Sequence, residues 1–194
     1  MEVLALRGRA LGPVLPALAE LRIRVFRDWP YLYDGTLEYE ASYLKKFSAA
    51  EDALVVVVRE SDKIVGASTA TPLLGHADEF ARPFVDQGYD PDRVFYFGES
   101  VLLPEYRGRG LGHAFFDVRE SHARRSGCFE IAAFCAVVRE ASDPRAPADY
   151  QPLDAFWTKR GYFKKEGLIT SFPWKECGGD EDVLHPMQYW IKRL

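Results

Sequence analysis

A glycine-rich turn, Arg107-Gly108-Arg109-Gly110-Leu111-Gly112, constrains the fold of this chain more than any other stretch. It follows an apolar run from Val94 to Leu103 and precedes an amphipathic stretch from His113 to Ser126. Glycine at every second position leaves the backbone amides uncovered, so several N–H groups can point at one anion. A helix start adds the positive end of its dipole, and Arg107 and Arg109 add charge. The sequence therefore predicts a strand–turn–helix unit that binds a phosphate-bearing ligand.

The composition is that of one globular domain spanning residues 1–194, with 47% hydrophobic and 14% aromatic residues. The net charge of −4 argues against a general nucleic-acid binder, because no positive field would attract phosphate backbones. Three cysteines without paired metal spacing suit a reducing compartment. The N-terminus has no signal-peptide pattern, and no window is long and apolar enough for a membrane span. We expect a cytoplasmic protein with no metal and with neither nucleic acid nor membrane as partner.

Hydrophobic periodicity predicts alternating strands and helices. In the N-terminal half we expect a strand at 3–6, a helix from Pro13 to about Phe26, an aromatic loop at 29–35, a helix at 37–47, and strands at 53–58 and 64–70. Residues 71–93 read as an inserted loop with a short helix near Ala77 to Gln87. Further strands are expected at 94–103, 131–138, 168–172 and 187–191, with helices at 113–126 and 153–160. This order predicts one α/β domain with a mixed sheet.

Spacing separates the glycine turn from two common phosphate loops. A dinucleotide fingerprint needs a third glycine where His113 stands, and a P-loop needs Gly-Lys-Ser/Thr, which is missing. The pattern that fits is Arg107-x-x-Gly110-x-Gly112, which resembles the acyl-CoA-binding motif of the GNAT N-acetyltransferase superfamily. The alternative is a turn that only lets strand and helix pack closely.

The resemblance extends from Val94 to Arg160, where the order of strands and helices is similar to the family core. Phe156 to Tyr162 looks like the family's later aromatic–glycine motif. The resemblance implies a single GNAT-like α/β domain, with a mixed, mostly antiparallel sheet of about six to seven strands flanked by about four helices. The insertion at 71–93 is longer than the usual connection.

The resemblance also implies a binding mode for acetyl-CoA, the expected co-substrate. Backbone groups of Val101, Leu102 and Leu103 would bind the pantetheine arm, where their strand splays from its neighbour. An N–H near Leu102 would polarise the thioester carbonyl. The pyrophosphate would be held by the turn and helix start, namely Arg107, Gly108, Arg109, Gly110, Leu111, Gly112 and His113.

Two residues are candidates for catalysis by direct transfer to an amine. Glu99 lies within the apolar strand, where desolvation would raise its pKa toward that of a general base; the alternative is a structural glutamate. The family commonly places its proton-donating tyrosine where this chain has Trp157, whose indole cannot donate a catalytic proton. Tyr150 is the candidate in its place and Tyr162 a weaker one, and the alternative for each is an aromatic residue that only packs.

The acceptor amine is expected near the first two helices, because the family sets acceptor specificity there. Arg27, Tyr31 and Tyr33 would line this site, or the aromatic loop would only cap the core. Cys135 sits in an apolar strand and reads as a packed core thiol.

We therefore expect an acetyl-CoA-dependent N-acyltransferase that acts on a primary amine of a small molecule. A non-catalytic acyl-CoA-binding or sensing module of the same fold is the main alternative, and a purely structural subunit is a third. An exposed C-terminal strand could pair across a homodimer.

Overall fold

Seven strands form one sheet with the order β1-β2-β3-β4-β5-β7-β6 in the computed structural model, which describes residues 1–75 and 78–194. Neighbouring strands pair antiparallel, except that β4 and β5 are parallel. The strands are β1 (Glu2–Arg7), β2 (Leu54–Glu60), β3 (Lys63–Pro72), β4 (Val94–Leu102), β5 (Ile131–Val137), β6 (Phe163–Lys175) and β7 (Asp182–Arg193). The expected mixed, mostly antiparallel α/β sheet is confirmed.

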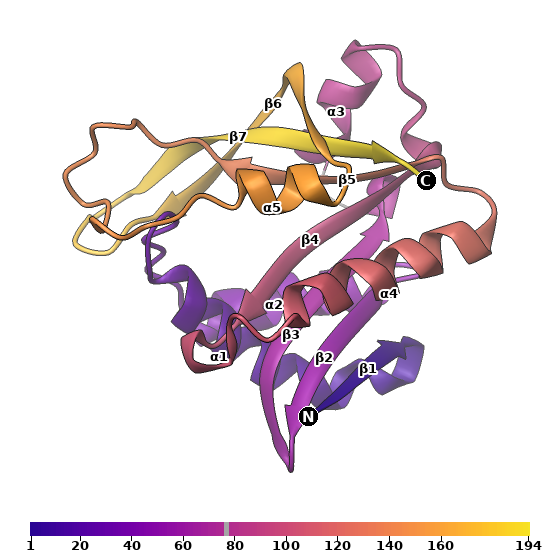
Figure 1. The fold of residues 1–194 in the computed structure, drawn as a ribbon, viewed down its shortest axis with the longest axis horizontal. Coiled ribbons are helices and arrows are strands. Elements are labelled where there is room, and N and C mark those ends of the chain that lie inside the picture. The colour runs from indigo at the N-terminus through magenta and orange to yellow at the C-terminus, as the bar shows by residue number, and fades with distance from the viewer. Residues whose placement is uncertain (76–77) are drawn as a thin grey trace.

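Helices cover both faces of this sheet (Figure 1). In that view α4 and α5 lie in front of the strands, α1 and α2 lie behind them, and α3 lies toward the end that carries β6. In the described residues the α-helices are α1 (Leu15–Phe26), α2 (Leu37–Ala49), α3 (Asp78–Asp86), α4 (Leu111–Ser126) and α5 (Asp154–Lys159).

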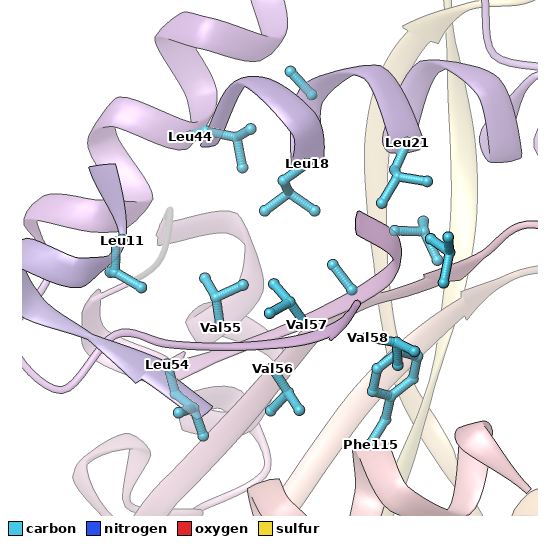
Figure 2. Close-up of a cluster of buried hydrophobic side chains, with 14 of the residues drawn as sticks. Leu11, Leu18, Leu21, Leu44, Leu54, Val55, Val56, Val57, Val58 and Phe115 are labelled. Atoms are coloured by element: carbon cyan, nitrogen blue, oxygen red, sulfur yellow. The ribbon is translucent and has the colours of Figure 1, made fainter. Parts of the chain in front are cut away.

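Strand β2 shows why the N-terminal half packs as it does (Figure 2). Its side chains alternate between the two faces: Val55 and Val57 point toward Leu18 of α1, whereas Val56 points to the side that carries Phe115 of α4. All five are buried. A strand covered on both faces is a continuous apolar run, which is the pattern that predicted it.

A β-bulge interrupts β4 in the middle of the sheet. Phe97 pairs with Ala70 and Ser100 pairs with Ser68, so Gly98 and Glu99 together face the single residue Thr69. A Cβ atom on Gly98 would lie 2.5 Å from Thr69 Oγ1, so this position requires glycine. The Glu99 amide donates to the same Thr69 oxygen at 3.2 Å. The bulge thus fixes the backbone that carries Glu99.

Beyond the first few residues, β4 and β5 separate. Their pairing covers Val94, Phe95 and Tyr96 of β4, opposite Ile131 to Ala133 of β5. From Phe97 onward, no strand of the described residues pairs with the β4 edge that faced β5. The two strands therefore form an opening next to the bulge, as the resemblance implied.

The structure makes three local expectations more specific. The final strand β7 lies between β5 and β6, so β6 is the C-terminal strand at the edge of the sheet, and pairing across a dimer at that edge stays a prediction. Helix α4 begins at Leu111 rather than His113, after a 3₁₀ turn at Pro104–Tyr106. The short helix expected within 71–93 is confirmed as α3, and its Phe80 and Phe84 are buried. Ala77, the expected start of its helix, lies outside the described residues.

Candidate active site

The glycine turn has the backbone conformation that only glycine adopts without strain. Gly108 and Gly110 have φ of +74° and +78°, and no heavy atom lies within 4 Å of where a Cβ would stand. Helix α4 starts directly afterwards, so its first amides, at Leu111, Gly112 and His113, have no intrahelical acceptor. The turn therefore presents uncovered N–H groups beside open space, which fits an anionic group such as a pyrophosphate.

Side chains around the turn frame this open space. Arg107 Nε donates to the Leu102 carbonyl at 3.3 Å, and Arg109 donates to the Glu105 carbonyl at 2.9 Å. His113 contacts Arg160 through Nδ1 at 3.2 Å, so its side chain is engaged. Both predicted arginines lie at the turn, where they supply positive charge.

The last residue of β4 and the residue after it direct their backbone N–H groups to opposite sides of the strand. The Leu103 N–H donates to the Val65 carbonyl of β3 at 3.1 Å. Because successive residues of a strand direct their backbone groups to opposite sides, the Leu102 N–H points away from β3. That is the side from which β5 has diverged, so Leu102 offers an amide to the opening and Leu103 does not.

Glu99 is a buried carboxylate at the bulge, with 6% of the residue exposed. Its Oε2 accepts a hydrogen bond from Arg22 Nη1 of α1 at 2.5 Å, and no donor among the described residues bonds to Oε1. Burial raises the pKa of Glu99 above its ordinary value, although the charge of Arg22 opposes this effect. A carboxylate in this state suits general-base chemistry near neutral pH.

Arg22 links Glu99 to a second buried carboxylate. Its Nε donates to Glu40 Oε2 at 2.5 Å, and the Tyr33 hydroxyl donates to Glu40 Oε1 at 2.8 Å. The guanidinium also lies 4.5 Å from the centre of the Tyr43 ring. One cation thus serves two carboxylates, and α1, α2 and β4 are joined at this point.

A cavity of about 100 Å³ opens beside Glu99. It lies on the face of the sheet covered by α1, α2 and α3, and residues from those helices and from β4, β5, β6 and β7 line it. The lining residues are Arg22, Phe26, Tyr31, Tyr33, Tyr39, Tyr43, Phe80, Tyr96, Gly98, Glu99, Cys135, Phe172, Trp174 and Met187. Gly98 and Cys135 belong to the diverging strands, so the cavity adjoins the opening.

Arg119 of α4 holds the bulge from the opposite face of the sheet. This fully buried guanidinium donates to the carbonyls of Thr69 and Glu99, each at 3.2 Å, and to Ser100 Oγ at 2.8 Å. It also lies 4.3 Å from the centre of the Phe97 ring. These hydrogen bonds link β3 to β4 at the bulge, which is where the Glu99 side chain faces the cavity.

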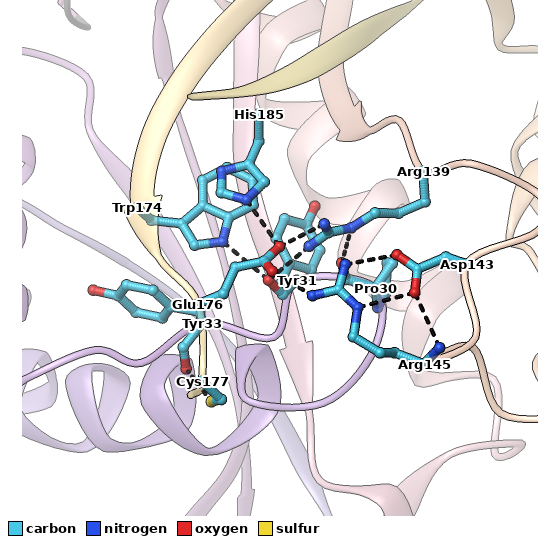
Figure 3. Close-up of polar contacts among 10 residues, drawn as sticks. All are labelled: Pro30, Tyr31, Tyr33, Arg139, Asp143, Arg145, Trp174, Glu176, Cys177 and His185. Carbon is cyan, nitrogen blue, oxygen red and sulfur yellow. Dashed lines mark hydrogen bonds and ion pairs between the residues drawn. The ribbon is translucent and has the colours of Figure 1, made fainter. Parts of the chain in front are cut away.

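The loop that carries Tyr31 is anchored to the far end of the sheet (Figure 3). The Tyr31 carbonyl accepts hydrogen bonds from Trp174 Nε1 at 2.9 Å and from Arg139 at 3.0 Å. Arg139 also pairs with Glu176, which in turn contacts Arg145. Burial alone would raise the pKa of Glu176, but hydrogen bonds from Arg145, Arg139 and His185 lower it to about 2. This network fixes one wall of the cavity.

The remaining predicted site residues divide into two groups. Tyr31 and Tyr33 line the cavity. Arg27 does not: its side chain is 61% exposed and pairs with Asp34 on the surface. Tyr150 is not among the lining residues either, and its ring packs edge-on against Trp29 at 6.1 Å between centroids.

The other aromatic candidates are core residues. Trp157 packs between Phe134 and Trp190, each ring centroid 5.0 Å away. Tyr162 is buried under α4, and its hydroxyl donates to Glu120 at 3.1 Å. Burial raises the pKa of the Cys135 thiol to about 12, which fits the expected packed thiol although it borders the cavity.

Sequence reasoning missed Arg22 and Glu40, although a signal for both was present. Glu40 precedes the buried Leu44 and Phe47 at helical spacing, and Arg22 follows the buried Leu18 by one helical turn. A charged residue on an apolar stripe is buried with a partner, because an unpaired buried charge is too costly. The spacing could therefore have marked both residues as buried charges that need partners.

Neither a metal centre nor a membrane span emerges from the described residues. No three His, Cys, Asp or Glu side chains among them are grouped as metal ligands. None of the helices in residues 1–75 and 78–194 combines the length and hydropathy needed to cross a bilayer.

Comparison with known proteins places the chain in a family. The model of the acetyltransferase (GNAT) family matches residues 16–153, which include the bulge and the glycine turn. No curated protein sequence matches the chain.

Solved structures share the fold across the whole chain. A ribosomal-protein-alanine N-acetyltransferase from Brucella melitensis superposes with a TM-score of 0.63 at 15% identity, covering 98% of this chain and 99% of its own. A GNAT-family acetyltransferase from Streptococcus pneumoniae gives 0.60 at 14% identity, covering 100% of both chains. An aminoglycoside 6′-N-acetyltransferase complexed with coenzyme A gives 0.59 at 14%, covering 100% and 97%. At this identity the likeness concerns the fold.

Proposed function

Since the chain belongs to the GNAT acetyltransferase family, we propose that it transfers an acetyl group from acetyl-CoA to a primary amine of a small molecule, with Glu99 as general base. The observation that carries the proposal is the position of Glu99: a buried carboxylate with a raised pKa, at a β-bulge that borders both a cavity and the opening between β4 and β5. Those two spaces would receive the amine and the thioester.

The glycine turn would hold the pyrophosphate of acetyl-CoA. The positive φ of Gly108 and Gly110, the empty space beside them and the uncovered amides of Leu111 to His113 support this role, with charge from Arg107 and Arg109. Leu102 would bind the pantetheine arm through its backbone. The predicted Val101 and Leu103 do not fit this role, because the Leu103 N–H bonds to Val65 and Val101 directs its backbone to the same side, toward β3.

The groups at the bulge would carry out transfer of the acetyl group to the amine. Bound acetyl-CoA supplies the thioester carbonyl. Glu99 accepts one proton from the ammonium, and the neutral amine attacks the carbonyl carbon to form the new C–N bond. As the C–S bond breaks, the nitrogen releases a second proton, which balances the proton that the leaving thiolate takes up. The Leu102 N–H stabilises negative charge on the carbonyl oxygen. The leaving thiolate takes up a proton, for which the sequence suggests Tyr150 while the cavity offers Tyr31 and Tyr96; Tyr→Phe variants at the three positions decide between them.

Two measurements test this function against its alternative. A thermal-shift titration with CoA should raise the melting temperature, and acetyl-CoA incubated with a panel of primary amines should yield acetylated product. A melting shift without product from any amine would favour the non-catalytic acyl-CoA-binding module. The absence of a shift at millimolar CoA would reject both.

A further inference from the structure

The cavity beside Glu99 has a wall made mostly of aromatic rings. Nine of its fourteen lining residues are Phe, Tyr or Trp. The rings support one another: Phe80 lies 5.3 Å from Tyr96 and 5.5 Å from Phe172, and Tyr31 lies 5.8 Å from Trp174, all between centroids. Rings packed at these distances have fixed positions, so the wall is formed before anything binds.

Helix α3 contributes to this wall. It belongs to the 71–93 segment and places Phe80 against β4 and β6. Phe80 is 7% exposed, so its ring is held by the fold rather than lying on the surface. The segment that is long for this fold therefore closes one side of the cavity with an apolar surface.

The buried Glu99 carboxylate keeps one oxygen available for a ligand. Arg22 bonds to Oε2 of Glu99 and to Glu40, and Arg119 bonds to the backbone carbonyl of Glu99 from the other face of the sheet. Oε1 of Glu99 is buried and has no donor among the described residues. An ammonium group could donate to this oxygen, whereas a carboxylate would meet a like charge and a guanidinium that is already shared. Aromatic faces nearby favour a cation as well.

The size of the cavity limits the rest of the ligand. At about 100 Å³ it is comparable to the ~150 Å³ apolar cavity known to hold benzene. Tyr39, 47% exposed, marks the side nearest solvent, and Tyr96, 2% exposed, marks the interior.

We infer that the acceptor is a primary amine that carries one aromatic ring or an apolar group of similar size and binds as its ammonium ion at Glu99. This inference rests on the proposed acetyl transfer for its chemistry. It separates the chain from the ribosomal-protein and aminoglycoside acetyltransferases that share its fold.

The first test compares acceptors with one protein preparation. We expect kcat/KM for 2-phenylethylamine to exceed that for an N-terminal alanyl peptide and for kanamycin by at least tenfold. A kcat/KM for either the peptide or kanamycin equal to that for 2-phenylethylamine would overturn the inference and leave the acetyl transfer standing.

The second test removes one ring of the wall. Phe172→Ala should raise KM for 2-phenylethylamine about three- to tenfold, because an aromatic contact contributes roughly 0.5–1.5 kcal/mol, with KM for acetyl-CoA unchanged. Phe163→Ala is the matched control, since Phe163 is on the same strand but 51% exposed and outside the cavity. Equal KM values for the two variants would count against the aromatic wall as the binding surface.

A binding measurement separates the two proposals. Isothermal titration calorimetry with 2-phenylethylamine, in the presence of CoA, should show binding that the neutral 2-phenylethanol lacks or shows at least tenfold more weakly. Selective binding without acetyl transfer would contradict the proposed function and support the acceptor class. Absence of binding, or equal binding of the alcohol, would overturn the acceptor class.

Discussion

Arg22 Nη1 lies 2.5 Å from Glu99 Oε2, and this contact joins α1 to the bulge of β4. The same guanidinium bonds to Glu40 of α2, so one buried cation fixes the orientation of the proposed base and the position of two helices. Burial raises the pKa of Glu99 and Arg22 lowers it. The pair thereby sets the pH at which Glu99 can accept a proton.

Removal of Arg22 should change the pH profile of the reaction. Arg22→Gln takes away the charge that lowers the pKa of Glu99, while Glu40 continues to raise it. A base must be unprotonated, so the acid limb of kcat/KM should move to higher pH. Arg24→Gln, on the exposed side of the same helix, should leave the profile in place. An acid limb that moves equally in both variants, or in neither, would argue against Arg22 as the residue that positions and tunes Glu99.

Replacement of Arg119 should cost more stability than a surface arginine does. Arg119→Met leaves the Thr69 and Glu99 carbonyls without their buried donor, at a cost of about 1–3 kcal/mol for each unsatisfied group. Urea denaturation measures the loss, with Arg125→Met on the exposed face of α4 as control. Equal midpoints for the two variants would mean that the bulge does not depend on Arg119.

Glycine at position 110 should matter for both folding and ligand binding. Gly110→Ala forces a side chain into a conformation with φ of +78° and should destabilise the protein by about 1 kcal/mol or more. It should also weaken CoA binding about tenfold or more, because the amides of the turn move. Gly12→Ala is the control, at a glycine with open surroundings and no positive φ. Calorimetry with CoA would contradict the account if both variants bound equally.

Cys135 should be inert although it borders the cavity. Burial raises its pKa to about 12, so it is protonated at neutral pH, whereas Cys128 is exposed. Brief iodoacetamide treatment at pH 8, read by peptide mass spectrometry, should modify Cys128 and spare Cys135. Alkylation of Cys135 at the same rate, or an acetyl group trapped on its sulfur, would instead indicate an acyl-enzyme.

Local patterns predicted the elements but not how distant ones meet. The apolar run of β2 and the glycine turn before α4 are each encoded by adjacent residues, so both were predicted. The order of β5, β7 and β6 depends on the pairing of β5 with β7 across residues 138–181, which periodicity does not report. The sequence therefore did not indicate which of the two C-terminal strands forms the edge of the sheet.

The site residues also divide into those that a local pattern predicts and those whose position depends on distant contacts. Glu99 and the turn were found from their own segment, whereas Arg22 is 77 residues away in sequence and reaches Glu99 because of the bulge at Thr69. Arg27 and Tyr150 were chosen for their side-chain chemistry. Their positions depend on a surface pair with Asp34 and on packing against Trp29, which the sequence pattern did not indicate.

Glu99→Gln tests the central claim most directly. The substitution keeps the shape of the side chain and removes its ability to accept a proton, so acetyl transfer from acetyl-CoA to 2-phenylethylamine should fall by about 10²- to 10⁴-fold in kcat/KM. CoA affinity by calorimetry should stay within twofold, and Glu38→Gln, exposed on α2, should retain full activity. A Glu99→Gln enzyme as active as the Glu38→Gln control would contradict the assignment of Glu99 as the general base.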